Sequence, residues 1–587
     1  MIRESWILKN RNVNLDEISS KYNISKIVSK LIVNRDIVTD EEIERYINTS
    51  YEMLYNPESM KNMKLAVKIL KNKINVGAKI RIIGDYDVDG VISVFILYKA
   101  LKRAGANVDF EIPDRIKDGY GINENIIDEA YREGIDTIVT CDNGIAAIEQ
   151  IKHAKQLGLT VIVTDHHDIP FVEEDGQRRF ISSEADAIIN PKQIDCNYKF
   201  KKICGAGVAF KLIEQLFKEL NIDKSESYKL IEFVAIATVC DVVDLIDENR
   251  VFVKKGLELL NNTDNIGLKA LKKNNNLGDV KITSYHLGFV IGPCINASGR
   301  LDSAKKGLEL LLCNDEDKAD VLAKEIVELN NQRKDMTKSG VEKAIEIIEN
   351  TEIGKDRILV IYINNIHESI AGIIAGRIKE KYNKPTIILT KSEDGVKGSA
   401  RSIEEYNLFE GLMECKNILD KFGGHPMAAG MSLSEKNVDN LRKMLNEKCK
   451  LTDDDLIKKI KIDLAVGLGQ LNTSVVEELN ILEPFGNGNT KPVFGVKNVR
   501  ILSATKVGKN NNVLKLKLRN QDKVLEGIIF NNIDEVEEKI INKYGKKALE
   551  DIYSSIDSNV IVDLIFYPSI NEWNGKKSLQ IIINNIR

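Results

Sequence analysis

The alternation of hydrophobic and polar positions divides the chain into five parts. In residues 76–260, short β-branched runs alternate with helical patterns, which predicts a parallel sheet joined by right-handed crossovers. The predicted strands of this α/β domain are 79–84, 108–112, 136–141, 160–164 and 186–190. Ligands of such sheets bind beyond the carboxyl ends of the strands, so the residues that follow each strand are the candidates for function.

The next parts show helical and then mixed patterns. Residues 1–75 are polar and predict an N-terminal helical cap. Residues 261–353 predict a connecting region that contains a long charged helix from about Asp315 to Asn350. Residues 354–452 predict a second, smaller α/β domain, with strands at 358–363, 386–390 and 396–400.

Residues 460–587 change to a β pattern, with predicted strands at 493–503, 513–519, 523–530, 560–567 and 578–586. A small Greek-key barrel of the OB type accommodates such strands. Lys515, Lys517 and Arg519 alternate along one of them, which places three cations on one face. We therefore expect a β-rich OB-like domain with a basic groove for single-stranded nucleic acid.

Composition narrows the possible functions. A length of 587 residues exceeds one hydrophobic core and predicts three or four domains of about 100 to 200 residues. The net charge of −4 excludes the global basic field of an obligate duplex-DNA binder, so a nucleic-acid site must be local. The 8 cysteines form no Cys-x-x-Cys pair, which argues against zinc and disulfides and favours the reducing cytoplasm. No signal peptide and no apolar run of the roughly 18 residues that a membrane span needs are found in the sequence.

Carboxylates gather where the predicted strands end. Asp85, Asp87 and Asp89 follow the first strand, Asp142 the third, and Asp165-His166-His167-Asp168 the fourth, while an apolar helix ends at Asp241. Because the ends of parallel strands meet at one edge of the sheet, we expect these four segments to converge. Crowded carboxylates repel one another by several kcal/mol on the order-of-magnitude scale, and a divalent cation removes this cost.

Carboxylate oxygens combined with imidazoles suit Mn²⁺ or Mg²⁺. Six or more candidate ligands exceed what one octahedral ion needs, which predicts two ions roughly 3.5 to 4 Å apart. For the first segment alone, the alternative is an acidic surface loop that faces water. For His166 and His167, the alternative is a pair of structural histidines.

Candidate phosphate ligands lie further along the chain. Arg300 lies in Gly292–Leu301, a small-residue segment expected to form a loop, where it can bind a phosphate or pair with Asp302. Expected loops of the second α/β domain carry Ser399, Arg401, Gly423, Gly424 and His425. Glycine pairs let backbone amides approach an anion, although tight turns explain them equally well.

The order of these motifs resembles that of the DHH-family phosphoesterases, from about residue 75 to at least 500. The motifs are Gly84-Asp85-Tyr86-Asp87-Val88-Asp89-Gly90, Pro113-Asp114-Arg115, Gly119-Tyr120-Gly121, Asp142-Asn143-Gly144, Asp165-His166-His167, Gly205-Ala206-Gly207, Gly299-Arg300-Leu301, Gly423-Gly424-His425 and Glu483-Pro484-Phe485-Gly486-Asn487-Gly488-Asn489. The full set is most similar to that of the bacterial single-strand-specific DNA exonucleases of this family. Such a resemblance implies a DHH catalytic domain, a connecting helix, a DHHA1 domain and an OB-like DNA-binding domain.

The resemblance also implies a role for each site residue. Asp87, Asp89, Asp142, His166 and Asp241 match metal ligands, and Asp85 and His167 match catalytic positions. The substrate would be held by Arg300, Ser399, Arg401, His425, Gly423 and Gly424. Three departures from the family pattern, at Asp244, Glu368–Ile370 and Glu405, remove none of these residues.

The function implied by the resemblance is a metal-dependent 5′-to-3′ exonuclease that hydrolyses single-stranded DNA to 5′-mononucleotides in DNA repair and recombination. Single-stranded DNA would be the main partner, with a single-strand-binding protein and a helicase as protein partners, and we expect a cytoplasmic monomer. One alternative is a DHH phosphodiesterase for short oligonucleotides or cyclic dinucleotides. Another is an inactive scaffold, against which the complete ligand set argues.

Overall fold

The computed structural model describes residues 4–174, 177–392, 395–530, 532–556, 558–573 and 575–587. The chain forms two compact units. Apart from the first three residues, the larger unit contains Thr49–Ile457 and Gly486–Gly488, and the smaller unit contains Glu4–Asn48, Lys458–Phe485 and Asn489–Arg587. The domain boundaries expected from the sequence stay a prediction.

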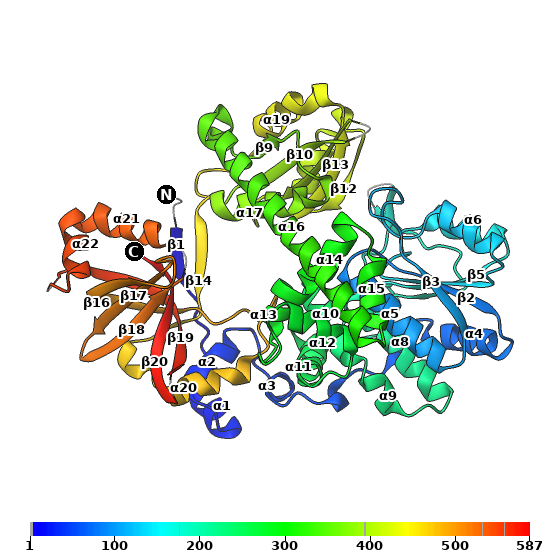
Figure 1. Cartoon of the computed structure of the whole chain (residues 1–587), viewed down its shortest axis with the longest axis horizontal. Coiled ribbons are helices and arrows are strands. Elements are labelled where there is room, and N and C mark those ends of the chain that lie inside the picture. The colour runs from blue at the N-terminus through cyan, green and yellow to red at the C-terminus, as the bar shows by residue number, and fades with distance from the viewer. Residues whose placement is uncertain (1–3, 175–176, 393–394, 531, 557, 574) are drawn as a thin grey trace. The chain divides into compact units, whose positions relative to one another are not determined.

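The first sheet of the larger unit is parallel, with the strand order β3-β2-β4-β5-β8. Its strands are β2 (Lys79–Ile83), β3 (Asn107–Glu111), β4 (Thr137–Cys141), β5 (Thr160–Thr164) and β8 (Ala187–Ile189). All five agree with the predicted strands within two residues, and each neighbouring pair is parallel. The predicted parallel-sheet α/β domain is therefore confirmed (Figure 1).

Alternate residues of these strands face opposite layers of helices. Ile80 and Ile82 of β2 pack into the core formed with α4 (Met63–Asn75), α5 (Val88–Arg103), α8 (Gly205–Glu219) and α10 (Ile231–Cys240). Ile83 packs on the other side, with α6 (Glu124–Arg132) and α7 (Ile148–Gln156). Because both faces are covered, the free edge at the carboxyl ends of the strands remains for a site. A two-stranded hairpin, β6 (Phe171–Glu174) and β7 (Gln177–Phe180), follows the His166-His167 segment.

Helices connect this domain to the second sheet. After α11 (Asp247–Asn261) and α12 (Ile266–Asn274), α13 (Ser284–His286) runs through a π-helical turn (Leu287–Ile291) into α14 (Gly292–Leu301) and α15 (Lys305–Leu312). The expectation of a loop at Gly292–Leu301 is wrong. Its small residues serve helix packing instead, since a Cβ on Gly299 would lie 2.4 Å from the carbonyl oxygen of Tyr86. The long helix predicted next is α16 (Glu316–Asn350), capped by the side chain of Asp315.

The second sheet has the order β12-β13-β11-β10-β9. Its strands are β9 (Leu359–Tyr362), β10 (Thr386–Ser392), β11 (Gly395–Arg401), β12 (Lys421–His425) and β13 (Ala428–Leu433), with α17 (Ala371–Tyr382), α18 (Leu408–Met413) and α19 (Val438–Glu447) between or after them. Gly423 and Gly424 were expected in a loop, but they lie in β12 and pair with Gly430 and Ala429. Ser399 and Arg401 likewise lie in β11, at the registers of Gly430 and Ala428.

The smaller unit is built on a closed barrel. Its strands β16 (Phe494–Val507), β17 (Val513–Asn520), β18 (Lys523–Ile529), β20 (Lys576–Ile586) and β19 (Ile561–Trp573) pair in this order, and β19 pairs again with β16. The OB-like prediction is thus confirmed (Figure 1). Two helices that the pattern did not predict, α21 (Ile533–Tyr544) and α22 (Lys546–Tyr553), are inserted between β18 and β19.

The N-terminal segment completes the smaller unit. Strand β1 (Glu4–Leu8) pairs in parallel with β14 (Lys458–Ile462), and it precedes α1 (Leu15–Tyr22), α2 (Lys26–Val33) and α3 (Asp40–Ile47). The short elements β15 (Leu464–Ala465) and α20 (Thr473–Glu478) lead into the barrel, and α9 (Lys224–Tyr228) belongs to the larger unit. Within the described residues, no helix combines the length and the apolar character that crossing a bilayer requires.

Candidate metal centre

The turn between β2 and α5 carries the first three acids. Asp87 caps α5, because its Oδ1 accepts the amides of Asp89 at 2.9 Å and Gly90 at 3.1 Å. Asp89 lies in the first helical turn, and its two carboxylate oxygens accept the amides of Gly205 at 2.6 Å and Ala206 at 2.8 Å. These bonds fix two of the acids at the amino ends of α5 and α8, where the helix dipoles favour negative charge.

Asp142 follows β4 in a left-handed backbone conformation, with φ of 60°. Only a residue without a side chain fits opposite it, since a Cβ on Gly205 would lie 2.8 Å from Asp142 Oδ1. Asn143 fastens this turn by donating to the carbonyl oxygens of Ile83 at 3.1 Å and Cys141 at 2.9 Å. The Asp142 carboxylate is consequently held in a buried position after β4, next to the first residue of α8.

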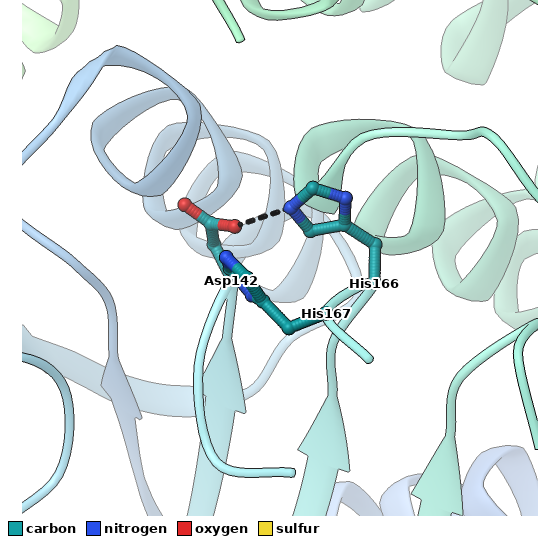
Figure 2. A group of neighbouring side chains, drawn as sticks. All are labelled: Asp142, His166 and His167. Atoms are coloured by element: carbon teal, nitrogen blue, oxygen red, sulfur yellow. Dashed lines mark ion pairs between the residues drawn. The ribbon is translucent and has the colours of Figure 1, made fainter. Parts of the chain in front are cut away.

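The segment after β5 carries Asp165, His166 and His167. Asp165 is buried, and its Oδ1 accepts the amide of His166 at 2.7 Å and lies 2.7 Å from Nδ1 of His167. Since a carboxylate only accepts, Nδ1 of His167 is the donor. Figure 2 shows that His166 and His167 both approach Asp142, with His166 Nε2 at 3.1 Å from Asp142 Oδ1.

Three overlapping groups of potential ligands lie here, each with ligand atoms within 4.8 Å of one another. They are Asp85-Asp87-Asp142, Asp89-His166-Asp241 and Asp142-His166-His167. The Nε2 atom of His166 lies 3.7 Å from Asp89 and 3.8 Å from Asp241, the residue that ends α10. The four separated segments therefore converge at the strand ends, as the sequence predicts, and Asp142 and His166 each belong to two groups.

The crowding shifts the acids toward their neutral forms. Burial and the charge of Asp87 raise the pKa of Asp85 to about 8 and that of Asp89 to about 6. Burial and the charge of Asp89 raise the pKa of Asp241 to about 9, and the same causes raise the pKa of Asp142 well above its usual range. Without a cation the cluster is electrostatically costly.

The two histidines differ in their charge state. Burial and the neighbouring His167 lower the pKa of His166 to about 3, so this imidazole is neutral and has a nitrogen lone pair for a metal. Burial alone would lower the pKa of His167, but the hydrogen bond and the charge of Asp165 outweigh it and raise this pKa to about 9. His166 is therefore neutral and His167 is protonated at neutral pH, so the two adjacent residues can have different roles.

The donor set fits divalent cations. Among the residues that the structure describes, several buried atoms of the cluster make no hydrogen bond: both carboxylate oxygens of Asp85, Asp241 Oδ2, and the Asp142 Oδ1 and His166 Nε2 atoms, whose 3.1 Å contact is an ion pair only if the imidazole is protonated. Buried polar atoms normally have a partner, so this concentration at one place calls for a ligand. Carboxylate oxygens together with a neutral imidazole are suitable ligands for Mn²⁺ or Mg²⁺.

A group of arginines lies beside the acids. Arg300, in the last turn of α14, donates through Nη1 to the backbone carbonyl of Ser369, while Asp302 pairs with Lys306 at 2.9 Å. Burial and the charges of Arg115, Arg333 and Arg401 lower the pKa of Arg300 to about 10, and the charge of Asp87 opposes them. The alternative in which Arg300 pairs with Asp302 is therefore not observed.

A cavity of about 510 Å³ opens between the two sheets of the larger unit. It is lined by Tyr86, Arg115, Glu368, Ser369, Ala371, Lys397, Gly398, Lys421, Phe422, Gly423, Gly430, Met431 and Ser432. Of the six predicted substrate residues, Gly423 lines this cavity. Arg401 donates to Ser399 Oγ at 3.3 Å, whereas His425 is exposed at the end of β12.

Three neighbours of the site were not assigned a role from the sequence. Asp165 orients His167, Asn143 fastens the Asp142 turn, and the Tyr120 hydroxyl donates to the Asp142 carbonyl oxygen at 2.8 Å. All three lie within the quoted motifs. The residue type alone does not show whether such a residue binds a ligand or supports a neighbour, because each role depends on a contact that the sequence does not reveal.

The basic strand lies in the smaller unit. In β17, Lys517 and Arg519 are exposed and Lys515 is half-buried, while the alternating residues Leu514, Leu516 and Leu518 are buried. Lys515 pairs with Glu526 of β18 at 2.8 Å, which offsets its charge. The alternation expected from the sequence is present, with Lys517 and Arg519 as its exposed cations.

Comparisons with known proteins agree with this architecture. Three family models match: the DHH family N-terminal domain at residues 79–238, the DHHA1 domain at 355–451 and the RecJ OB domain at 462–585. The single-stranded-DNA-specific exonuclease RecJ of Bacillus subtilis is 38% identical over 97% of this chain and 69% of its own length. RecJ of Escherichia coli is 32% identical over 95% of both chains. The chain belongs to the RecJ family.

Solved RecJ structures have the same fold. The crystal structure of Thermus thermophilus RecJ with Mn²⁺ covers 100% of this chain and 80% of its own, with a TM-score of 0.81 and 24% identity. A second RecJ crystal structure, bound to manganese, covers 69% of this chain and 99% of its own, with a TM-score of 0.58 and 27% identity. The DHH, DHHA1 and OB domains expected from the resemblance are confirmed for this RecJ-family chain.

Proposed function

We propose that this chain is a metal-dependent exonuclease that hydrolyses single-stranded DNA from the 5′ end and releases 5′-mononucleotides, in DNA repair and recombination. The observation that carries the proposal is the convergence of the three ligand groups, linked because Asp142 and His166 each belong to two of them, at the strand ends of a RecJ-family chain. The relatives named above are single-stranded-DNA-specific exonucleases, and the 5′-to-3′ direction rests on the family resemblance.

Five residues would hold two Mn²⁺ or Mg²⁺ ions: Asp87, Asp89, Asp142, His166 and Asp241. The RecJ structure bound to manganese supports this choice of metal. Asp85 lies beside Asp87 and Asp142 with both carboxylate oxygens buried and unpartnered among the described residues, so it completes the anionic wall of the site. When bound, such ions lower the pKa of water and offset the negative charge of a phosphodiester.

His167 would face the substrate. Its side chain is 42% exposed, against 10% for His166, and Asp165 occupies its Nδ1 atom. Nε2 is therefore the atom that can donate to a phosphate oxygen, beside the Tyr120 hydroxyl at 3.3 Å. A hydrogen bond to an oxygen on which charge develops stabilises the transition state more than the ground state.

The arginine group would bind phosphate. Burial and the charges of Arg115, Arg333 and Arg401 lower the pKa of Arg300, and a phosphate beside this guanidinium would offset both effects. We assign Arg300, Ser399, Arg401, Gly423, Gly424 and His425 to the substrate. Lys515, Lys517 and Arg519 would contact the strand farther from the cleaved bond.

The test uses one single-stranded oligonucleotide labelled separately at its 5′ and 3′ ends. With Mn²⁺, the 5′-labelled strand should release a labelled mononucleotide at once, and the 3′-labelled strand should shorten gradually. EDTA should stop both reactions. Turnover of dinucleotides without cleavage of the oligonucleotide would instead identify a phosphodiesterase for small substrates.

The cellular setting is also a proposal. All eight cysteines are free thiols, which supports the reducing cytoplasm as the compartment. A single-strand-binding protein and a helicase as partners, and a monomeric state, stay predictions for which pull-down and sedimentation experiments are the tests.

A further inference from the structure

The loop that follows Asp241 has an unusual backbone. Asp241 is the last residue with helical dihedral angles after α10, and Val242 then has φ of 59°. This left-handed position after a helix is normally occupied by glycine. A β-branched residue there is a conformational outlier that costs on the order of the strain seen at functional sites.

Packing does not explain why Val242 keeps this conformation, because its side chain is 64% exposed. Hydrogen bonds from Asn487 to the loop supply the constraint instead. Nδ2 of Asn487 donates to the Val242 carbonyl oxygen at 2.9 Å and to Asp244 Oδ1 at 2.8 Å. The Asn487 carbonyl oxygen accepts the amide of Leu245 at 2.7 Å. One residue thus holds the loop at three places.

The glycines on either side of Asn487 allow it to lie close to the loop that follows Asp241. A Cβ on Gly486 would lie 2.5 Å from Cδ1 of the buried Leu245, and one on Gly488 would lie 2.8 Å from Cβ of Asp244. Gly488 also has φ of +68°. The tripeptide Gly486–Gly488 belongs to the larger unit, so the contact lies within one compact body.

We infer that Asn487 is a positioning residue for the metal centre, which holds the Asp241 carboxylate toward His166 by locking the strained turn at Val242. The inference rests on the proposed function, because it takes Asp241 as a metal ligand. Asp241 has no partner among the described residues for its buried Oδ2, so its orientation depends on the backbone that carries it. Released from Asn487, the turn would relax and the carboxylate would leave the position 3.8 Å from His166 Nε2.

The experiment measures Mn²⁺ binding by calorimetry on the full chain, without DNA. Asn487→Ala should weaken binding by about 5- to 20-fold, because a part of the free energy of the two lost hydrogen bonds appears as a loss of metal affinity. Val242→Gly should remove the strain, since glycine adopts this φ freely. The double variant Val242→Gly, Asn487→Ala should therefore bind Mn²⁺ within about threefold of Val242→Gly alone.

Asn489→Ala is the matched control. Asn489 donates to the carbonyl oxygens of Leu482 and Pro484, so its loss should lower thermal stability and leave Mn²⁺ affinity unchanged. Unchanged affinity in Asn487→Ala, or no recovery in the double variant, would overturn the inference. Absence of Mn²⁺ binding by the unsubstituted chain would instead overturn the metal site itself, so the two failures are distinguishable.

Discussion

Asp165 Oδ1 lies 2.7 Å from Nδ1 of His167 and accepts a hydrogen bond from it, while Asp165 Oδ2 accepts the amide of Ile145 at 2.9 Å. The buried carboxylate thereby ties a half-exposed imidazole to the turn that carries Asp142. An imidazole whose Nδ1 is fixed in this way presents Nε2 in one orientation.

The first prediction concerns this pair. Asp165→Asn should lower kcat on single-stranded DNA by 10- to 100-fold, because partners that orient site histidines have effects of this size. The measurement is steady-state hydrolysis at saturating Mn²⁺. Asp168→Asn is the control: Asp168 is two residues beyond His166, pairs with Lys192 on the surface, and should change kcat less than twofold. An equal loss in both variants would refute an orienting role of Asp165.

The second prediction concerns the cost of the acid cluster. Asp142→Asn removes one of the crowded carboxylates and keeps a residue that tolerates φ of 60°. The metal-free variant should therefore unfold at a temperature roughly 2 to 4 °C higher than the unsubstituted chain. It should also lose exonuclease activity and most of the Tm increase produced by Mn²⁺.

Scanning calorimetry with EDTA and with Mn²⁺ gives both quantities. Asp128→Asn, at an exposed position that contacts His153 away from the site, serves as the control and should keep the full Mn²⁺ response. A metal-free Asp142→Asn protein less stable than the unsubstituted chain would show that the cluster is not under repulsion.

The sequence correctly predicts which residues gather at the carboxyl ends of the parallel strands, and the reason is physical. β-branched runs such as Ile80–Ile83 are recognisable locally, and the parallel-sheet rule brings the residues after them together without further information. The role of Asp165 is different, because an acid that orients an imidazole and an acid that binds a metal look alike in sequence. The contact between Asn487 and Val242 joins positions far apart in the chain, and no local pattern indicates it.

The prediction of loops in two glycine-rich segments is wrong for a related reason. Gly292–Leu301 and Gly423–Gly424 have loop-like composition, yet they form α14 and β12. In both, small residues permit close packing rather than turning, as the approach of Gly299 to Tyr86 and the pairing of Gly423 with Gly430 show. Local propensity is overridden wherever a neighbouring segment supplies the contact.

The third prediction concerns Arg300. Arg300→Ala should lower kcat/KM for single-stranded DNA by 10- to 100-fold, because a charged hydrogen bond to phosphate contributes about 1.5 to 3 kcal/mol. Arg300→Lys should recover only part of the loss, since lysine keeps the charge without the planar donor fork. Arg377→Ala, on the exposed face of α17, is the control and should leave kcat/KM unchanged. If Arg300→Lys fully recovers kcat/KM, Arg300 acts through its charge alone.

The fourth prediction concerns the basic strand β17. Lys517→Ala combined with Arg519→Ala should weaken single-stranded DNA binding and reduce the slope of log K against log salt by about 1.4, which is about 0.7 for each lost contact. Fluorescence anisotropy at several salt concentrations gives this slope. The control is Lys546→Ala combined with Lys547→Ala. Both lysines are exposed on α22, and this double variant removes the same charge. Equal slopes for the two double variants would mean that β17 does not contact DNA.

The fifth prediction concerns a buried acid outside the metal centre. Glu232, in the first turn of α10, is 8% exposed, and burial raises its pKa from 4.5 to about 7. A raised carboxyl pKa means that the neutral form is favoured on folding. The stability contributed by this form is full below about pH 4.5 and is lost as the pH rises toward 7.

Glu232→Gln keeps the neutral shape at every pH. The variant should therefore match the unsubstituted chain near pH 4.5 and exceed it at pH 8 by up to about 3 kcal/mol in free energy of unfolding. Denaturant titration at both pH values with EDTA present measures this difference. Glu258→Gln, at an exposed position that pairs with Lys255, should show no such pH dependence. A Glu232→Gln advantage that is the same at both pH values would have a packing cause, because a cavity or contact effect does not titrate.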